Sequence, residues 1–141
     1  MYSNNLTKEV YKAAQSGLTA IQTVMPKIQN SALQKQVERQ GACYKNLSEK
    51  AEKILSQNGM LPKELSAMQK ATMWGAIQMH TIANASPEHI AEIMINGTTM
   101  GIVDLTKKMN DLPDAEEKDK RFAREYLSSE EKHIEALKAF L

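Results

Sequence analysis

The chain is poor in the residues that mark a secreted or membrane-embedded protein. Its 141 residues include a single cysteine, Cys43, so no disulfide can form within the chain. A lone cysteine is typical of a reducing compartment. The opening residues, MYSNNLTKEVYK, lack the apolar core of a signal peptide, and no apolar run elsewhere is long enough to span a membrane. We therefore expect a cytoplasmic protein with no membrane contact.

Aromatic residues and excess charge are also scarce. Phenylalanine, tryptophan and tyrosine make up 5% of the chain, and the formal net charge is +1. A domain that binds nucleic acid usually carries a basic surplus, so no nucleic-acid partner is expected. Strand signals are missing as well, because no window alternates apolar and polar residues for more than a few positions. The absence of strand signals predicts an all-α fold.

Apolar residues do recur every three or four positions along the chain, which is the period of an amphipathic helix. This pattern predicts helices over about 5–25, 31–57, 65–83, 87–108 and 114–141. The four prolines fall at or between the ends of these segments, at positions 26, 62, 87 and 113. No linker is long enough to separate two domains, so residues 1–141 are expected to form a single domain.

The lengths of the connections predict how the helices are arranged. Short turns make the first two helices antiparallel neighbours, and likewise the last two. The stretch between these pairs, about 60–86, can run the length of a bundle at ~1.5 Å per residue. This is the pattern of a ferritin-like four-helix bundle with one long crossover, which here would itself be helical. In the alternative arrangement, the 65–83 segment is a fifth helix of an up-and-down bundle.

The helix predicted over 87–108 is apolar on nearly all sides. Besides its core-facing seam it carries a second group of apolar residues: Ile90, Ile93, Met100 and Val103. A helix of this kind is usually buried on more than one face. Gly97 and Gly101 lie one turn apart and would allow another backbone to approach closely. We therefore expect this helix to be central, and we expect self-association as a homo-oligomer, or a contact with a protein partner.

Two stretches resemble a small bacterial family of ferritin-like bundles that has no assigned activity. They are HIAEIMINGTTMGIVDLTKKMN, residues 89–110, and EEKHIEALKAFL at the C-terminus. The LPK at residues 61–63 and the segment around Trp74 add to the resemblance, which covers most of the chain. The resemblance implies the bundle fold and assigns no function.

Glu130 and His133, in the last predicted helix, have the spacing of half a di-metal site. Side chains three residues apart share one helix face, and ferritin-like sites take a Glu-x-x-His pair from each of two helices and a glutamate from each of two others. The first two helices lack these ligands, because no acidic residue lies between Glu9 and Glu38, and Gly41 follows Glu38 where a histidine is needed. A complete di-metal site is therefore not expected.

A reduced site is the remaining metal hypothesis. Counted from the turn near Leu112, Glu130 should face residues 92–94 of the preceding helix. Glu92, Glu130 and His133 are thus the candidate ligands of one iron, manganese or zinc ion.

In the opposing hypothesis, Glu130 is a buried polar residue without a metal. It then takes a hydrogen bond from Gln40, Tyr44, Tyr11 or His133. No catalytic triad order, phosphate-binding loop or zinc-type cysteine spacing occurs in the sequence. We favour a non-enzymatic protein with a structural or protein-interaction role and no cofactor. A non-haem metal-binding or oxidoreductase protein is the alternative.

Overall fold

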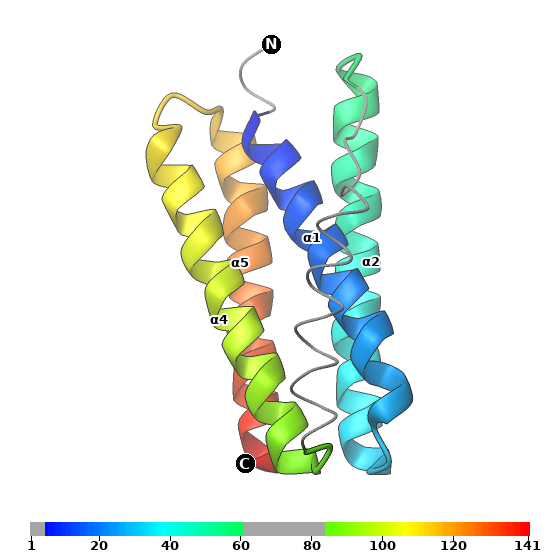
Figure 1. Ribbon diagram of the computed structural model, residues 1–141. Coiled ribbons are helices and arrows are strands. Elements are labelled where there is room, and N and C mark those ends of the chain that lie inside the picture. The colour runs from blue at the N-terminus through cyan, green and yellow to red at the C-terminus, as the bar shows by residue number, and fades with distance from the viewer. Residues whose placement is uncertain (1–4, 61–83) are drawn as a thin grey trace.

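The computed structural model describes residues 5–60 and 84–141, and within these ranges it contains four long helices and no strand (Figure 1). The helices are α1 (Asn5–Val24), α2 (Ser31–Gln57), α4 (Pro87–Asp111) and α5 (Glu117–Leu137). Single turns of 3-10 helix follow α1 and α5, as η2 (Met25–Lys27) and η3 (Lys138–Phe140). The all-α prediction is confirmed for the described residues. The helix predicted over 65–83 lies outside them.

Two helical hairpins form the bundle. α1 packs along α2, and α4 packs along α5, as the short connections predicted (Figure 1). α1 and α5 run in one direction and α2 and α4 in the other, so α2 ends at the opposite end of the bundle from the start of α4. The hairpins meet mainly through α1, which also contacts α4 and α5.

Helix ends follow the local chemistry, with two small departures from prediction. Ser86 caps α4, its hydroxyl accepting from the His89 amide at 3.3 Å. α2 begins at Ser31 as predicted. The Ser31-x-x-Gln34 pattern indicates a cap at Ser31, but the capping side chain is that of Asn30, whose Oδ1 accepts from the Leu33 amide at 2.9 Å. α5 begins at Glu117, later than predicted, with residues 112–116 forming the connection. The connection thus lies about three residues later than predicted, which changes the level at which α4 and α5 face each other.

A single cluster of apolar side chains forms the core. Its largest fully buried members include Leu6, Leu33, Leu55, Ile90 and Leu137, contributed by all four helices. Each lies on the apolar stripe of its helix, which is why the sequence pattern located these helices correctly.

Two apolar residues of α4 are more exposed than predicted. Met100 is 72% exposed and Val103 is 48% exposed. A Cβ atom built on Gly97 would meet nothing within 4 Å. Within the described part of the chain, the second apolar group of α4 is therefore buried at Ile90, and the prediction that it is buried is wrong for Met100 and Val103.

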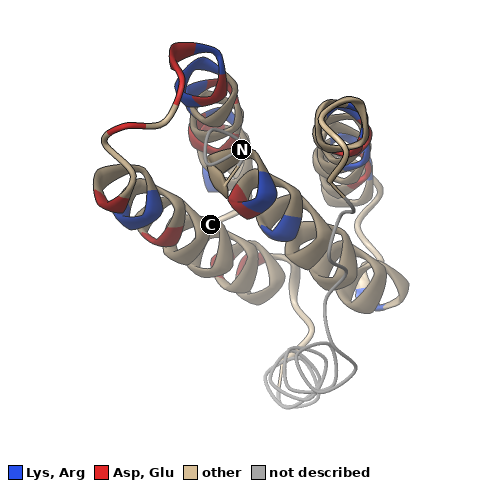
Figure 2. Ribbon diagram, turned by 90° about the horizontal axis from the view of Figure 1, so that it is seen from above, with Lys and Arg blue, Asp and Glu red and all other residues tan. Residues whose placement is uncertain are grey.

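Charged side chains of both signs are mixed on the surface. Figure 2 shows acidic and basic residues side by side on the first turns of α1 and α5. The pair Lys50–Glu125, at 3.1 Å, joins α2 to α5, but both side chains are about half exposed, so the pair stabilises the fold only slightly. Residues 13–26 and 93–103 contain no charge at all. Among the described residues, no helix is long and apolar enough to cross a membrane.

Candidate functional site

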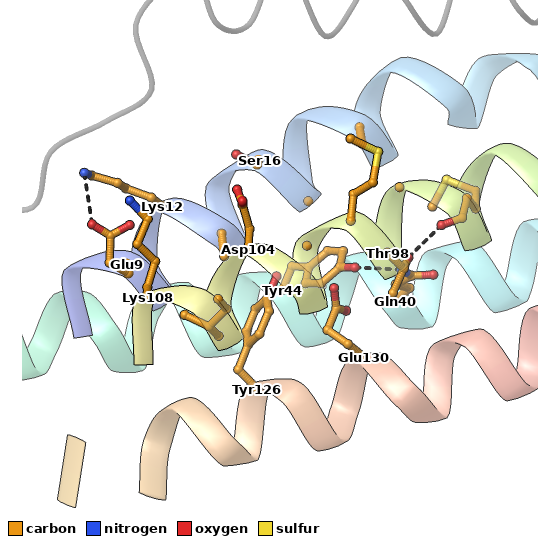
Figure 3. A pocket seen from close by; sticks show the side chains of 18 of the residues that line it. Glu9, Lys12, Ser16, Gln40, Tyr44, Thr98, Asp104, Lys108, Tyr126 and Glu130 are labelled. Atoms are coloured by element: carbon orange, nitrogen blue, oxygen red, sulfur yellow. Dashed lines mark hydrogen bonds and ion pairs between the residues drawn. The ribbon is translucent and has the colours of Figure 1, made fainter. Parts of the chain in front are cut away.

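A cavity of about 600 Å³ lies between α1 and α4 (Figure 3). Small-molecule sites in proteins span roughly 300–1,000 Å³, so this volume is sufficient for an organic ligand. All four helices line the cavity. The lining residues are Glu9, Lys12, Ala13, Ser16, Gly17 and Ala20 of α1, Gln40 and Tyr44 of α2, Ile93, Met94, Gly97, Thr98, Met100, Gly101, Asp104, Leu105 and Lys108 of α4, and Tyr126 and Glu130 of α5.

Small side chains explain why this space is hollow. The α1 wall includes Ala13, Ser16 and Ala20, which lie along one side of that helix. Across the cavity, Gly97 has no side chain, and open space lies where its Cβ would be. Larger residues at these positions would fill the gap between the helices. The hollow is thus a consequence of the sequence of α1 and α4.

The cavity floor carries one buried carboxyl group, that of Glu130. This residue is only 2% exposed, and its carboxylate rises from α5 toward the Tyr44 ring (Figure 3). Burial raises the pKa of Glu130 to about 7, although hydrogen bonds from the Tyr44 and Tyr126 hydroxyls act in the opposite direction. Of the four partners considered for an inward-facing Glu130, namely Gln40, Tyr44, Tyr11 and His133, the structure places Tyr44 beside its carboxyl group.

Gln40 connects this carboxyl group to α4. Its side-chain nitrogen donates to the Tyr44 hydroxyl oxygen at 2.7 Å and to the Thr98 hydroxyl oxygen at 3.1 Å. The Thr98 hydroxyl in turn donates to the Met94 carbonyl at 2.7 Å. Tyr44 thus accepts from Gln40, and its hydroxyl group interacts with the Glu130 carboxyl group. One hydrogen-bonded network, the floor network of Gln40, Tyr44, Thr98, Tyr126 and Glu130, joins α2, α4 and α5.

The two tyrosines of this network are held close together and protonated. Their rings are stacked, with centroids 6.1 Å apart. Burial is the main cause that raises the pKa of both hydroxyl groups above the ordinary value of a tyrosine, and the nearby Glu130 carboxylate adds to the shift. Both hydroxyls therefore remain hydrogen-bond donors at neutral pH.

Two acceptor atoms of the floor network have no partner among the described residues. They are Oε1 of Glu130 and Oε1 of Gln40, both fully buried. Buried polar groups are nearly always hydrogen-bonded, and each one left unpaired costs roughly 1–3 kcal/mol. Both residues also line the cavity, so these unpaired atoms lie next to it.

The structure does not bring the three predicted metal ligands together. A Cβ atom on Gly101 would lie 3.7 Å from Oε2 of Glu130, so Glu130 faces Gly101 rather than residues 92–94. The connection between α4 and α5 lies about three residues later in the sequence than predicted, which shifts the level that faces Glu130 toward Gly101. Glu92 lies nine residues before Gly101, about 13 Å along the helix axis, and its side chain is exposed.

His133, the third predicted ligand, is half-buried next to Tyr44. The two rings meet edge to face with centroids 5.8 Å apart. Burial lowers the pKa of His133, and its Nε2 atom has no hydrogen-bond partner among the described residues. Across the described ranges, no three histidine, cysteine, aspartate or glutamate side chains are grouped so that they could hold a metal ion.

Sequence reasoning missed two parts of the site. Tyr126 was not predicted as a partner of Glu130, although a residue four positions earlier on a helix shares the same face. The cavity was also missed. The sequence feature that could have indicated the cavity is the set of small residues in α1. Such a set is equally typical of closely packed helices.

No protein-family model, curated protein or solved structure matches this chain. The resemblance to a ferritin-like family therefore stays a prediction. The function has to be inferred from the geometry of the cavity and its floor network.

Proposed function

We propose that the chain is a non-catalytic binding protein that holds a small, mainly apolar molecule in the cavity between α1 and α4. The observation that carries this proposal is a hollow with apolar walls above a buried polar floor. Ile93, Met94, Met100 and Leu105 supply the apolar wall on α4. Methionine side chains are flexible and adapt to irregular ligands. Sites with this combination, apolar walls and a few fixed polar groups, are typical of small-molecule binding.

Binding fits the floor network better than catalysis does. A carboxyl group with a pKa near 7 would suit general acid–base chemistry. However, its hydrogen-bond partners are Tyr44 and Tyr126, whose raised pKa values keep their protons in place. In the described lining, no serine, cysteine or lysine hydrogen-bonds to Glu130 as an activated nucleophile would require. The network fixes the carboxyl group for recognition.

The proposal includes the ferritin-like topology predicted from the sequence. α2 and α4 run in the same direction, which a single long connection between two antiparallel hairpins produces. Bundles of this class build their sites from side chains on facing helices in the core, and Gln40, Thr98 and Glu130 meet there.

A fluorescence titration with N-phenyl-1-naphthylamine, a neutral apolar probe, tests the proposal. We expect saturable binding of one probe per chain. Gly97→Leu should abolish it, because the new side chain extends into open space in the cavity without a clash. Thr99→Leu is the matched control, since Thr99 is exposed on the same helix and is not part of the lining.

The two variants give a clear decision. If Gly97→Leu and Thr99→Leu bind the probe as well as the unmodified protein, the cavity is not the binding site and the proposal fails. Circular dichroism of both variants confirms that the helices are retained.

A further inference from the structure

The hydrogen-bond capacity of the cavity floor is unbalanced toward acceptors. Both N–H groups of the Gln40 amide are used, by Tyr44 and by Thr98. The Thr98 hydroxyl proton goes to the Met94 carbonyl, and the hydroxyl groups of Tyr44 and Tyr126 interact with the Glu130 carboxyl group. Of the atoms left unpaired, Oε1 of Gln40 can only accept, and Oε1 of Glu130 accepts once the carboxyl group is ionised. A molecule that completes this floor must therefore donate hydrogen bonds.

The charges along the cavity favour a cationic donor at the floor. Glu9 pairs with Lys12 at 3.5 Å, and Figure 3 shows Lys108 beside them at one end of the cavity. Glu130 lies deeper and has no basic partner within 4.0 Å among the described residues. His133 does not supply one at neutral pH, because burial lowers its pKa. An ionised carboxylate buried without a cation is costly, and a ligand ammonium group would compensate it.

We infer that the ligand of this cavity is a primary alkylammonium compound whose charged group hydrogen-bonds to Glu130 and Gln40 and whose apolar chain extends along α1 and α4. This inference rests on the proposed function, since it assumes that the cavity is a binding site. An ammonium group has three N–H donors, which matches the two unpaired acceptors with one donor to spare. The small residues of α1 and the side chains of Met94 and Leu105 form an apolar path for the chain.

A head-group series on the unmodified protein tests the inference. n-Octylamine, n-octanol and octanoate share one chain length and differ in charge, so their competition with the naphthyl probe isolates the head group. We expect octylamine to bind about tenfold or more tightly than octanol, as befits a charge-assisted hydrogen bond to a buried carboxylate. Octanoate should bind most weakly, because it brings a second negative charge to the floor.

Glu130→Gln tests the same contact from the protein side. This substitution keeps the shape of the side chain and removes its charge, so octylamine affinity should fall about tenfold while octanol affinity changes little. Glu9→Gln is the matched control, because Glu9 also lines the cavity but pairs with Lys12. Its octylamine affinity should stay within about twofold of the unmodified protein.

The possible failures are distinguishable. If the probe binds and Gly97→Leu blocks it, but the three head groups compete equally, the inference is overturned and the proposed function stands. Equal octylamine binding by Glu130→Gln and Glu9→Gln also overturns it. If the probe does not bind to the cavity at all, both the proposed function and the inference fail.

Discussion

The ring of Tyr44 lies directly against the backbone of Gly17. A Cβ atom on Gly17 would come within 2.6 Å of two ring carbons, a distance that packed side chains do not adopt. The absence of a side chain at position 17 therefore allows Tyr44 to occupy the place from which it reaches both Gln40 and Glu130. One glycine of α1 thus determines the geometry of the cavity floor.

This relationship predicts opposite effects for one substitution at two positions. Gly17→Ala should destabilise the protein by about 1–3 kcal/mol, because the added methyl group displaces the Tyr44 ring. Gly97→Ala should stabilise it by up to ~1 kcal/mol, because alanine favours the helix and the methyl group meets open space. Urea unfolding of both variants measures the difference. Stabilisation by both substitutions would show that Tyr44 does not pack on Gly17.

The raised pKa of Glu130 predicts a pH dependence of the free energy of unfolding. The folded protein holds this proton up to about pH 7, whereas the unfolded chain releases it near pH 4.5. Between these values the folded state binds more protons, so the stability contributed by Glu130 is complete below pH 4.5 and is lost as the pH rises to about 7. The loss amounts to roughly 3 kcal/mol.

Comparison with Glu130→Gln isolates this contribution. The variant should match the unmodified protein at pH 4.5 and be more stable at pH 8, as measured by urea unfolding across that range. Glu131→Gln, an exposed neighbour on the same helix, controls for the loss of one negative charge. Parallel stability curves for all three proteins would mean that Glu130 titrates normally.

A second buried carboxyl group, that of Asp119, predicts that the protein loses stability when the hydrogen-bond donor to this group is removed. The Thr7 hydroxyl donates to Oδ1 of Asp119 at 2.8 Å, which connects the start of α1 to the start of α5. Both side chains are buried, and burial raises the pKa of Asp119. Thr7→Val keeps the side-chain shape but removes the hydroxyl, so it should cost about 1–3 kcal/mol.

Thr7→Ser is the control for this prediction. It retains the hydroxyl and loses one methyl group, so it should cost less than Thr7→Val at pH 7. Thermal unfolding of the two variants provides the measurement, and the reverse order would exclude a stabilising role for the hydrogen bond.

Self-association through α4 stays a prediction, and the exposed side of that helix indicates where to test it. Met100 and Val103 are two of the three large apolar side chains exposed among the described residues. We expect sedimentation velocity at micromolar concentration to detect an oligomer, and Met100→Lys combined with Val103→Lys to convert it to a monomer. Thr106→Lys, an exposed α4 control, should leave it assembled. If the unmodified protein is strictly monomeric, the prediction of self-association is wrong.

The sequence predicted which side chains of a single helix face inward. It predicted less well at which level two helices face each other. An inward-facing Glu130, three residues before His133, was predicted from the sequence, and Tyr44 was one of its four possible partners. Both follow from helical periodicity alone. Glu92 was misplaced because the level at which α4 and α5 face each other depends on where their connection lies, and it spans residues 112–116, later than predicted.

The cavity was harder to predict, because no sequence pattern distinguishes an empty space from close packing. Small residues such as Gly17 and Gly97 are compatible with tight packing and with open space. The two glycines have opposite surroundings, since a Cβ on Gly17 would clash with Tyr44 and one on Gly97 would meet nothing. Only the arrangement of the neighbouring helices distinguishes these cases.

Of the four described helices, α4, which forms one wall of the cavity, buries the smallest share of its residues. α4 buries five of its 25 residues, whereas α2 buries ten of 27. Helices with few buried groups open first in local unfolding, so the backbone amides of α4 should exchange with deuterium faster than those of α2. A ligand that bridges Glu130 and the α4 wall would slow this exchange. The protection of α4 amides would then report occupancy of the cavity, and transient release of α4 would provide the route by which a molecule enters and leaves.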